Sequence, residues 1–488
     1  MELDNLIDGI ETVDKINYKN VEITGISYNS KTTKKGDIFV CLRGEYTDGH
    51  KYFKMAEENG AVAFVCEEEL ETNLPQIIVK STRHQIADFA AAFFEYPSKD
   101  LNIIGITGTN GKTTVSHLVQ KIFEDNNQKC GLIGTLGHKF SSEDTYHDAK
   151  HTTPQAPELQ KLLRTFDEKE IKNVCMEVSS HALDQNRVGG INYKCAVITN
   201  LTQDHLDYHI LMENYFEAKA ILFRGLKSGC YAVLNADDEY YEKFRAVIPN
   251  GVKILTYGIK KQADLMAENI EYSIHGAKFD LKTKDGNYKL ELNLNGTFSV
   301  YNTLCALAVA VAYDIPYEIS IPTLNNVKNV AGRFEIVNKT PLVIVDYAHT
   351  PDGLENVLKA AREITPSESK LICLFGCGGD RDTTKRPKMG AIAEKFADKV
   401  VITSDNPRSE NPNQIISDIV AGLKSINPDK IFVEPDRGKA IELAKSISTE
   451  KDVIVLAGKG HEDYQILANE TIHFDDREVA RKIFGNEQ

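Results

Sequence analysis

The sequence lacks a segment that could cross a membrane or direct export. No apolar run approaches the ~20 residues that a membrane-spanning helix needs. The first residues, MELDNLIDGIETVD, are acidic and have neither the basic start nor the apolar core of a signal peptide. We therefore predict a cytoplasmic protein that has no membrane partner.

Positive charge is also in short supply. The chain carries 57 Lys and Arg against 71 Asp and Glu, a formal net charge of -14. A nucleic-acid partner would need a cationic surface that displaces counterions from phosphates. We therefore predict no nucleic-acid partner, and we expect any anionic ligand to be held by a few local groups.

Paired cysteines of the CxxC type are absent. The nine cysteines are scattered, and Cys175, Cys195 and Cys373 lie inside apolar runs, where a thiol behaves as a small hydrophobe. We expect buried, reduced thiols, and neither a disulfide framework nor a zinc site.

The chain also lacks internal repeats and low-complexity linkers, but its 488 residues exceed what one core can organise. We predict an α/β protein of three domains, residues 1–98, 99–331 and 332–488, the first ending where Tyr96-Pro97-Ser98 breaks a helix. Strand-like and helical segments alternate through the second and third domains, which indicates parallel sheets covered on both faces. We expect a central P-loop ATPase domain, with antiparallel ribbon over residues 254–295, and a Rossmann-like third domain.

The most informative stretch is Gly105 to Thr114, GITGTNGKTT, between a strand-like run, Leu101 to Ile104, and a helical segment. In such a loop backbone N–H groups cradle phosphates, Lys112 reaches the terminal phosphates and the Thr113 hydroxyl holds Mg²⁺. The usual pattern would need glycine in place of Ile106. The alternative is a glycine-rich turn with a chance lysine, but the strand and helix around it favour ATP or GTP binding.

Acidic and histidine side chains follow two later strand-like runs. Glu177 ends one of them, where a carboxylate suits Mg²⁺, although a solvated loop glutamate is the alternative. Asn200 to His209 contains two aspartates and two histidines. This segment indicates a second metal or phosphate site, or else a helix cap by Asp204 with solvated histidines.

Lys219 falls on one stripe of a predicted helix, Glu213 to Phe223, with Tyr215 and Leu222. The commoner explanation is a side chain that extends to solvent. The other is a carbamate, formed when the amine condenses with CO₂, which turns a cation into an oxygen ligand for Mg²⁺. Spacing does not choose between them.

Asp405-Asn406-Pro407-Arg408 forms a proline-fixed turn that presents an arginine. The planar guanidinium of Arg408 could read a carboxylate bidentately, together with Arg381. The alternative is a surface turn with an ordinary salt bridge.

In this order along the chain, the motifs resemble those of the Mur ligases, the ATP-dependent amide-forming enzymes of peptidoglycan precursor synthesis. Within that family the turn at Asp405 to Arg408 is similar to that of enzymes that add meso-diaminopimelate to UDP-N-acetylmuramoyl-L-alanyl-D-glutamate through an acyl phosphate. The matching motifs are the GTNGKTT loop, His151-Thr152-Thr153-Pro154, Glu177 to His181, Asn200 to His209, Lys219, Asn302, Gly332 to Glu335, Asp346 to Asp352 and Gly458 to Glu462.

The resemblance implies a role for each matched position. Lys112, Glu177, His205 and Lys219 would be catalytic, with Mg²⁺ held by Thr113, Glu177, His205 and carbamylated Lys219. The implied ATP site is Gly108, Thr109, Asn110, Gly111, Lys112, Thr113, Thr114, Asn302, Arg333 and Asp346. The implied site for the UDP-sugar peptide is Ser30, Thr152, Thr153, Ser179, Gln185 and Arg187. The implied diaminopimelate site is Arg381, Asp405, Asn406, Pro407, Arg408, Gly458 and Glu462.

Two positions depart from the family pattern: Asn29-Ser30-Lys31 stands where many relatives carry Asp-Ser-Arg, and His151 replaces a frequent asparagine. A lysine-adding ligase is the nearest alternative, which Arg408 disfavours; a folylpolyglutamate synthetase would lack the first domain. A P-loop regulator without ligase chemistry, or a kinase, would use the same phosphate loop. We expect a monomer whose third domain closes over the site.

Overall fold

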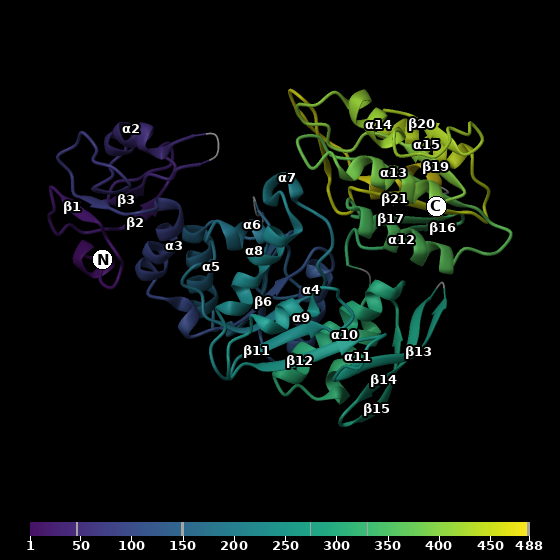
Figure 1. Cartoon of the computed structure of the whole chain (residues 1–488), viewed down its shortest axis with the longest axis horizontal. Coiled ribbons are helices and arrows are strands. Elements are labelled where there is room, and N and C mark those ends of the chain that lie inside the picture. The colour runs from purple at the N-terminus through teal and green to yellow at the C-terminus, as the bar shows by residue number, and fades with distance from the viewer. Residues whose placement is uncertain (45–46, 148–150, 274, 329, 486–488) are drawn as a thin grey trace.

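The computed structural model describes residues 1–44, 47–147, 151–273, 275–328 and 330–485. Three large sheets follow one another along the described chain, at the left, centre and upper right of Figure 1. The third part also contains a two-stranded sheet, β22 (Tyr464–Ile466) and β23 (Thr471–His473). The predicted α/β class with three sheet-bearing parts is confirmed. The boundaries at 98/99 and 331/332 stay predictions, and both fall between sheets.

The first part contains a five-stranded sheet in the order β1-β5-β4-β3-β2. The apolar runs Ile38 to Leu42 and Ala61 to Val65 predict two of its strands, which the structure confirms as β3 and β4. The sequence between them, HKYFKMAEENG, predicts one helix, but the Asp48 side chain accepts from His50 N and starts a separate 3-10 helix, Gly49–Tyr52. The elements are α1 (Leu3–Leu6), β1 (Asp14–Ile16), β2 (Gly25–Ser27), β3 (Asp37–Val40), α2 (Phe53–Glu58), β4 (Ala63–Cys66), β5 (Gln76–Ile78) and α3 (Thr82–Phe93), before a 3-10 turn, Pro97–Lys99.

The central part is built on β6 (Asn102–Thr107), whose residues are buried on both faces of the sheet. Ile104 and Ile106 pack with α4 and α10, whereas Ile103 packs with α5 and α8 on the other face. The predicted end of this strand at Ile104 was wrong, because pairing with β10 and β9 continues beyond it. Burial on both faces is what a parallel sheet between two helical layers requires.

The central sheet has ten strands in the order β15-β14-β13-β12-β11-β10-β6-β9-β7-β8. The antiparallel ribbon predicted over residues 254–295 is confirmed for the extension β13 to β15 at one edge. It was wrong for residues 254–258, which lie in β12 and pair in parallel with β11 and β13. The other elements of this part are α4 (Lys112–Asp125), β7 (Cys130–Gly134), β8 (Gly137–Lys139), α5 (Ala156–Glu168), β9 (Asn173–Glu177), α6 (Ser180–Asp184), β10 (Tyr193–Ile198), α7 (Leu206–His209), α8 (Met212–Arg224), β11 (Tyr231–Asn235), α9 (Tyr241–Ala246), β12 (Lys253–Gly258), β13 (Leu265–Ser273), β14 (Gly276–Thr283), β15 (Gly286–Leu292), α10 (Thr297–Ala312) and α11 (Tyr317–Asn326).

The third part has a six-stranded sheet in the order β16-β17-β21-β18-β19-β20, parallel except for β16. Its strands end beside loops that carry the predicted amino-acid site, as expected for an open α/β sheet. The elements are β16 (Glu335–Lys339), β17 (Leu342–Asp346), α12 (Pro351–Glu363), β18 (Leu371–Phe375), α13 (Lys385–Phe396), β19 (Lys399–Ile402), α14 (Pro412–Val420), β20 (Ile431–Val433), α15 (Arg437–Ser446), β21 (Val453–Ala457), β22 (Tyr464–Ile466), β23 (Thr471–His473) and α16 (Asp476–Phe484).

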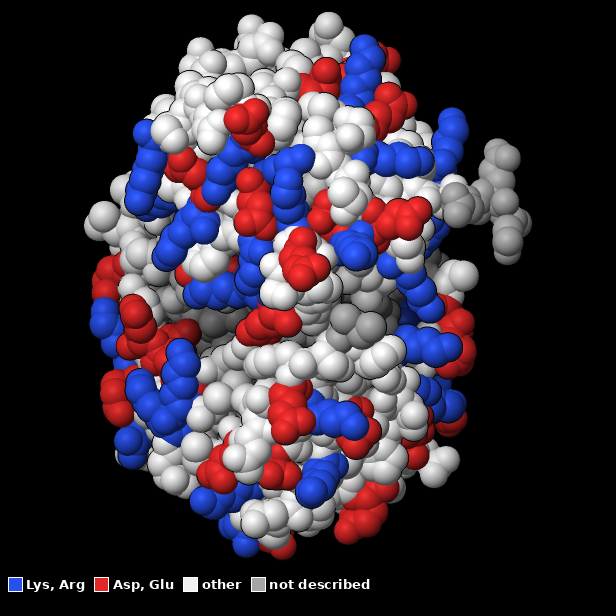
Figure 2. Space-filling model, turned by 90° about the vertical axis from the view of Figure 1, so that its right-hand side faces the viewer, with Lys and Arg blue, Asp and Glu red and all other residues white. Residues whose placement is uncertain are grey.

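The surface charge is mixed on the face drawn in Figure 2, where Lys and Arg are interspersed with Asp and Glu. The excess negative charge is therefore not gathered into one patch on this face. Within the described residues, no helix combines the length and the apolar character that crossing a bilayer would need.

Candidate active site

The loop between β6 and α4 has a backbone that favours glycine at two positions. Gly108 has φ +148°, and a Cβ there would lie 1.8 Å from Thr199 Oγ1. Gly111 has φ +86°, and its Cβ would lie 2.5 Å from Asn302 Oδ1. The two glycines let the chain turn tightly into α4, which begins at Lys112 and points its N-terminus at the site.

The ammonium of Lys112 is folded back over this loop. Its Nζ donates to the carbonyl oxygens of Gly108 and Thr109, each at 2.8 Å. Burial lowers the pKa of Lys112, and the nearby carboxylates of Glu177 and Asp204 oppose that shift. The loop therefore holds a cation where the phosphates of a nucleotide would lie.

Glu177, the last residue of β9, is fully buried, so the alternative of a solvated loop glutamate was wrong. Its Oε2 accepts from Thr113 Oγ1 at 3.1 Å and from Thr135 Oγ1 at 2.9 Å. The Thr113 hydroxyl in turn accepts from Arg333 Nη2 at 3.2 Å. A carboxylate, a hydroxyl and a guanidinium from the central and third parts thus meet at the start of α4.

Lys219 lies in α8, as predicted, but the explanation that it extends to solvent was wrong. Only 1% of the residue is exposed, and its Nζ donates to Gly108 O at 3.0 Å and lies 4.5 Å from the centre of the Tyr215 ring. Burial and the neighbouring Lys112 hold the pKa of Lys219 well below its usual value. Both effects favour the neutral amine, which is the form that reacts with CO₂.

His205 and Asp204 form a close pair beside the cavity. His205 Nε2 lies 3.3 Å from Asp204 Oδ2. Burial lowers the pKa of His205 to about 3, so the ring is neutral and can act as a ligand. The alternative of solvated histidines was wrong for His209, which is buried with Nε2 2.9 Å from Ser180 Oγ.

These groups surround a cavity of about 750 Å³ between the central and third parts. The cavity brings together most of the predicted ATP and metal residues. The predicted residues that line it are Thr109, Asn110, Gly111, Lys112, Thr113, Thr114, Thr152, Glu177, Ser179, His205, Asn302, Arg333 and Asp346. Gly108 and Lys219 lie directly behind this wall.

Of the remaining residues predicted to bind the UDP-sugar peptide, three lie close together and one does not. Arg187 Nε donates to Gln185 Oε1 at 3.0 Å, and Arg187 Nη1 donates to Thr153 O at 3.3 Å. Ser30 lies in the first part, where its hydroxyl donates to Met55 Sδ at 3.3 Å. Across the described residues, Ser30 makes no hydrogen bond to the other predicted members of this set.

Two loops of the third part converge on a buried polar cluster. Asn406 Nδ2 donates to Glu462 Oε2 at 2.8 Å, and Lys459 Nζ lies 3.3 Å from the same oxygen and 3.6 Å from Asp405 Oδ1. A Cβ on Gly458, which has φ +115°, would lie 3.2 Å from Asp405 Oδ2. Asp405 and Asn406 are 6% and 3% exposed, so the alternative of an ordinary surface turn was wrong.

Arg408 and Arg381 approach each other beside this cluster. Arg408 Nη1 donates to Gly379 O at 2.8 Å, and a Cβ on Gly378 would lie 2.9 Å from Arg408 Nη1 and 3.9 Å from Arg381 Cγ. Burial and the charge of Arg381 lower the pKa of Arg408. Two cations beside two carboxylates suit a ligand that carries both signs of charge.

Asp204 and Lys459 are buried charged groups that were not predicted as site residues. Asp204 lines the cavity, and Lys459 joins the two carboxylates of the third part. A signal for Lys459 was available, since it stands between two glycines directly after a predicted strand. Asp204 lies beside His205 in the segment Asn200 to His209. The spacing of the two aspartates and two histidines in this segment did not indicate which of them line the site.

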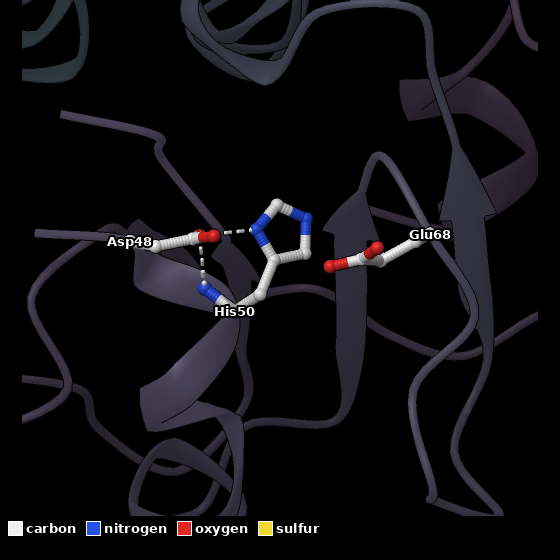
Figure 3. Close-up of side chains that lie close together, drawn as sticks. All are labelled: Asp48, His50 and Glu68. Atoms are coloured by element: carbon white, nitrogen blue, oxygen red, sulfur yellow. Dashed lines mark hydrogen bonds and ion pairs between the residues drawn. The ribbon is translucent and has the colours of Figure 1, made fainter.

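A separate group of three potential metal ligands, Asp48, His50 and Glu68, lies in the first part (Figure 3). His50 Nε2 accepts from Glu67 N at 2.9 Å, so its proton sits on Nδ1 and is donated to Asp48 Oδ1 at 2.6 Å. Arg43 already pairs with Asp48 at 3.5 Å and with Glu68 at 3.1 Å. Both ring nitrogens are hydrogen-bonded and both carboxylates pair with Arg43, so the structure describes this cluster as a hydrogen-bonded network.

Family models match all three parts of the chain. Residues 22–94 match the Mur ligase family catalytic domain, residues 106–310 the Mur ligase middle domain, and residues 332–460 the Mur ligase glutamate ligase domain. Together these matches span the sheets that form the cavity and the two converging loops.

Relatives are similar over almost the whole chain. UDP-N-acetylmuramoyl-L-alanyl-D-glutamate--2,6-diaminopimelate ligase of Bacillus licheniformis is 45% identical over 99% of this chain and 99% of its own length. A solved structure of a ligase with the same name is 34% identical, covers 94% of both chains and has a TM-score of 0.67. The ADP complex of MurF ligase from Thermotoga maritima has the same fold, with a TM-score of 0.67 at 19% identity over 94% of this chain and 96% of its own. This chain belongs to the Mur ligase family of ATP-dependent amide-bond ligases.

Proposed function

We propose that this ligase joins meso-2,6-diaminopimelate to UDP-N-acetylmuramoyl-L-alanyl-D-glutamate and releases ADP and phosphate. The observation that carries the proposal is the cluster of Arg408, Arg381, Asp405 and Glu462 at the carboxyl ends of the third sheet. Diaminopimelate carries two carboxylates and two amino groups, and this cluster offers partners for both.

ATP would lie with its phosphates at the N-terminus of α4. Lys112 and Arg333 supply positive charge there, and Asn302 and Asp346 line the same cavity. Phosphoryl transfer depends mostly on positioning and on electrostatic stabilisation of the transition state. The two cations are therefore the groups that we assign to the transferred phosphate.

The donor set fits Mg²⁺, a hard cation that prefers oxygen. Thr113 Oγ1 and Glu177 Oε2 lie 3.1 Å apart at the phosphate loop, and the neutral ring of His205 lines the same cavity. Carbamylated Lys219 would supply a further oxygen. When bound, Mg²⁺ would offset the negative charge of the phosphates.

The first chemical step is attack by the D-glutamyl side-chain carboxylate on the γ-phosphate. The bond from the γ-phosphorus to its bridging oxygen breaks, ADP leaves, and an acyl phosphate forms. The amine of diaminopimelate then attacks the acyl carbon, loses a proton and expels phosphate. Thr152 and Ser179 line the cavity on the side where the UDP-sugar peptide would enter, and Arg333 closes it from the third part.

Selectivity for diaminopimelate rests on Arg408. Lysine lacks the second carboxylate, so its binding would leave a desolvated guanidinium unpaired, a penalty of about 2 to 5 kcal/mol. The half-buried position of Arg408 beside Arg381 supports this assignment, because burial and the second cation both lower the pKa of Arg408, and a ligand carboxylate would offset both effects.

An isotope experiment tests the proposed chemistry. The D-glutamyl side-chain carboxylate of the UDP-sugar dipeptide is labelled with a heavy oxygen isotope. The enzyme is then supplied with ATP, Mg²⁺ and diaminopimelate, and the masses of the products are measured by mass spectrometry. We expect a UDP-sugar tripeptide and one labelled oxygen in the released phosphate. Unlabelled phosphate would refute the acyl phosphate, and a stable phosphorylated dipeptide would indicate a kinase.

A further inference from the structure

A fully buried ion pair lies beneath the two loops of the proposed amino-acid site. Arg437 and Asp476 are the first residues of α15 and α16, and both side chains are 0% exposed. Arg437 Nε donates to Asp476 Oδ1 at 2.7 Å, and Nη2 donates to Oδ2 at 2.6 Å. This is the bidentate geometry that fixes the plane of a guanidinium.

The rest of the guanidinium contacts the backbone at the ends of two strands. Nη1 donates to Ser404 O at 3.2 Å, and Nη2 donates to Ala457 O at 3.0 Å. Ser404 directly precedes Asp405, and Ala457 directly precedes Gly458. Because β18 lies between β19 and β21, the Arg437 side chain bridges across one strand and joins two loops that follow non-adjacent strands.

The start of α16 also holds the second loop from the other side. Arg477 Nη2 donates to His461 O at 3.3 Å, directly before Glu462, and Arg477 is itself held by Asp475. The loop that carries Glu462 is therefore attached to the first turns of these two helices at Ala457, directly before the loop, and at His461 within it.

Stability alone does not account for a pair of this kind. Taking two charges out of water is costly, and replacing a buried ion pair by apolar residues of similar volume is often neutral or stabilising. Lysine could not replace Arg437, because an ammonium cannot donate in one plane to a carboxylate and to two separate carbonyls. The geometry serves the relative placement of the two loops.

We infer that Arg437, held by Asp476, is a positioning residue for the amino-acid substrate. It sets the loop of Asp405 to Arg408 against the loop of Gly458 to Glu462, so that Arg408 and Glu462 face one bound molecule. The inference rests on the proposed function, because it takes these loops to be the diaminopimelate site.

The test uses the full chain with Arg437→Lys and, separately, Asp476→Asn. We measure kcat/KM for diaminopimelate and for lysine, and KM for ATP and for the UDP-sugar dipeptide. A displacement of about 1 Å can cost roughly a hundredfold in rate, so we expect kcat/KM for diaminopimelate to fall by about that factor. The preference, which is the ratio of kcat/KM for diaminopimelate to kcat/KM for lysine, should become smaller. KM for ATP and KM for the dipeptide should stay within about twofold of their values in the intact protein.

Ile441→Ala is the matched control, because Ile441 is buried in the same helix, one turn from Arg437, and touches neither loop. It should lower the unfolding temperature and leave the preference unchanged. If either pair variant also lowers only the unfolding temperature, the pair is structural and the inference is overturned.

If the single variants do not fold, the double substitution Arg437→Met with Asp476→Leu replaces the pair by apolar groups. A folded double variant with a narrowed preference supports the inference, and one with the preference of the intact protein overturns it. An intact protein that does not use diaminopimelate would refute the proposed function instead. The pair would then be tested on kcat/KM for the amino acid that it does use.

Discussion

Lys219 shows how burial of one residue can set chemistry. Burial and the neighbouring Lys112 hold its pKa well below the usual value, which favours the neutral amine, the form that can give a carbamate. We predict that Lys219→Ala lowers kcat by about 10²–10³-fold and that millimolar acetate restores part of it, because a small carboxylate can replace the missing ligand. ADP release measures both effects, and Lys121→Ala, at a half-buried position in α4 where the amine pairs with Asp125, is the control. Full activity of Lys219→Ala would contradict the assignment.

His209 makes stability depend on pH. Burial lowers its pKa to about 4, whereas in the unfolded chain it takes up a proton near its ordinary value of 6.5. Between these values the unfolded state binds more protons, so the free energy of unfolding falls as pH drops, by roughly 1.4 kcal/mol per unit for this group.

We therefore predict that, as pH drops from 6.5 to about 4, the free energy of unfolding falls less steeply in His209→Asn than in the intact protein. Urea denaturation at a series of pH values measures this slope. The exposed His84→Asn should keep the original slope. Equal slopes for all three proteins would contradict the buried, neutral state of His209.

At the scale of single residues, the sequence identified the candidate site residues and their order along the chain, but not whether each side chain is buried. Lys219 and Asp405 were both chosen as candidates, yet the spacing of Lys219 allowed a solvent-exposed amine and the tetrapeptide at Asp405 allowed a surface turn. Burial of both depends on neighbours supplied by distant segments, such as Gly108 and Lys459. Local patterns carry no information about such neighbours.

At the scale of elements, the turn from β6 into α4 depends on Gly108. A Cβ there would collide with Thr199 Oγ1, in addition to the backbone cost of about 1–2 kcal/mol for an L residue in a left-handed conformation. We predict that Gly108→Ala lowers both the unfolding temperature and ATP affinity. Gly229→Ala, with φ +86° and nothing within 4 Å of its Cβ, should show only the backbone cost and bind ATP normally. Calorimetry with and without ATP distinguishes the two variants. Equal ATP affinity in Gly108→Ala and Gly229→Ala would contradict the role of Gly108 in shaping the phosphate loop.

Elements with strong periodicity were predictable, and short ones were not. The strand–loop–helix unit of β6 and α4 and the helix α8 followed from apolar spacing. Strands β1, β2 and β5 have three residues each, too few for alternation to distinguish them from loops. Their place in the first sheet is fixed by pairing and not by their own sequence: β2 pairs with β3, β5 with β4, and β1 with β5.

At the scale of the whole molecule, the cavity exists because the third part lies against the central part. Asn110 Nδ2 donates to Asp352 Oδ2 at 2.8 Å, and Arg333 reaches Thr113 across the same boundary. Contacts between residues so far apart in sequence leave no local pattern. The sequence therefore provided candidates for the ATP site but did not predict how the two parts meet around them.

These contacts lead us to predict that ligands favour the closed arrangement. Ligand bridging should draw the third part toward the central part, which excludes water from the acyl phosphate. Small-angle scattering should show a smaller radius of gyration for the enzyme saturated with a non-hydrolysable ATP analogue and the UDP-sugar dipeptide than for the free enzyme. The same data report molecular mass and so test the predicted monomer. Superimposable curves would contradict closure.

The most direct test of the central claim is ADP release with ATP, Mg²⁺ and the UDP-sugar dipeptide, with meso-diaminopimelate or L-lysine added in parallel to the intact protein and to Arg408→Ala. We predict release only with diaminopimelate in the intact protein and a partial loss of this discrimination in Arg408→Ala, because the unpaired guanidinium that rejects lysine is then gone. Equal turnover of both amino acids by the intact protein would contradict the claim that the loop at Arg408 selects the substrate.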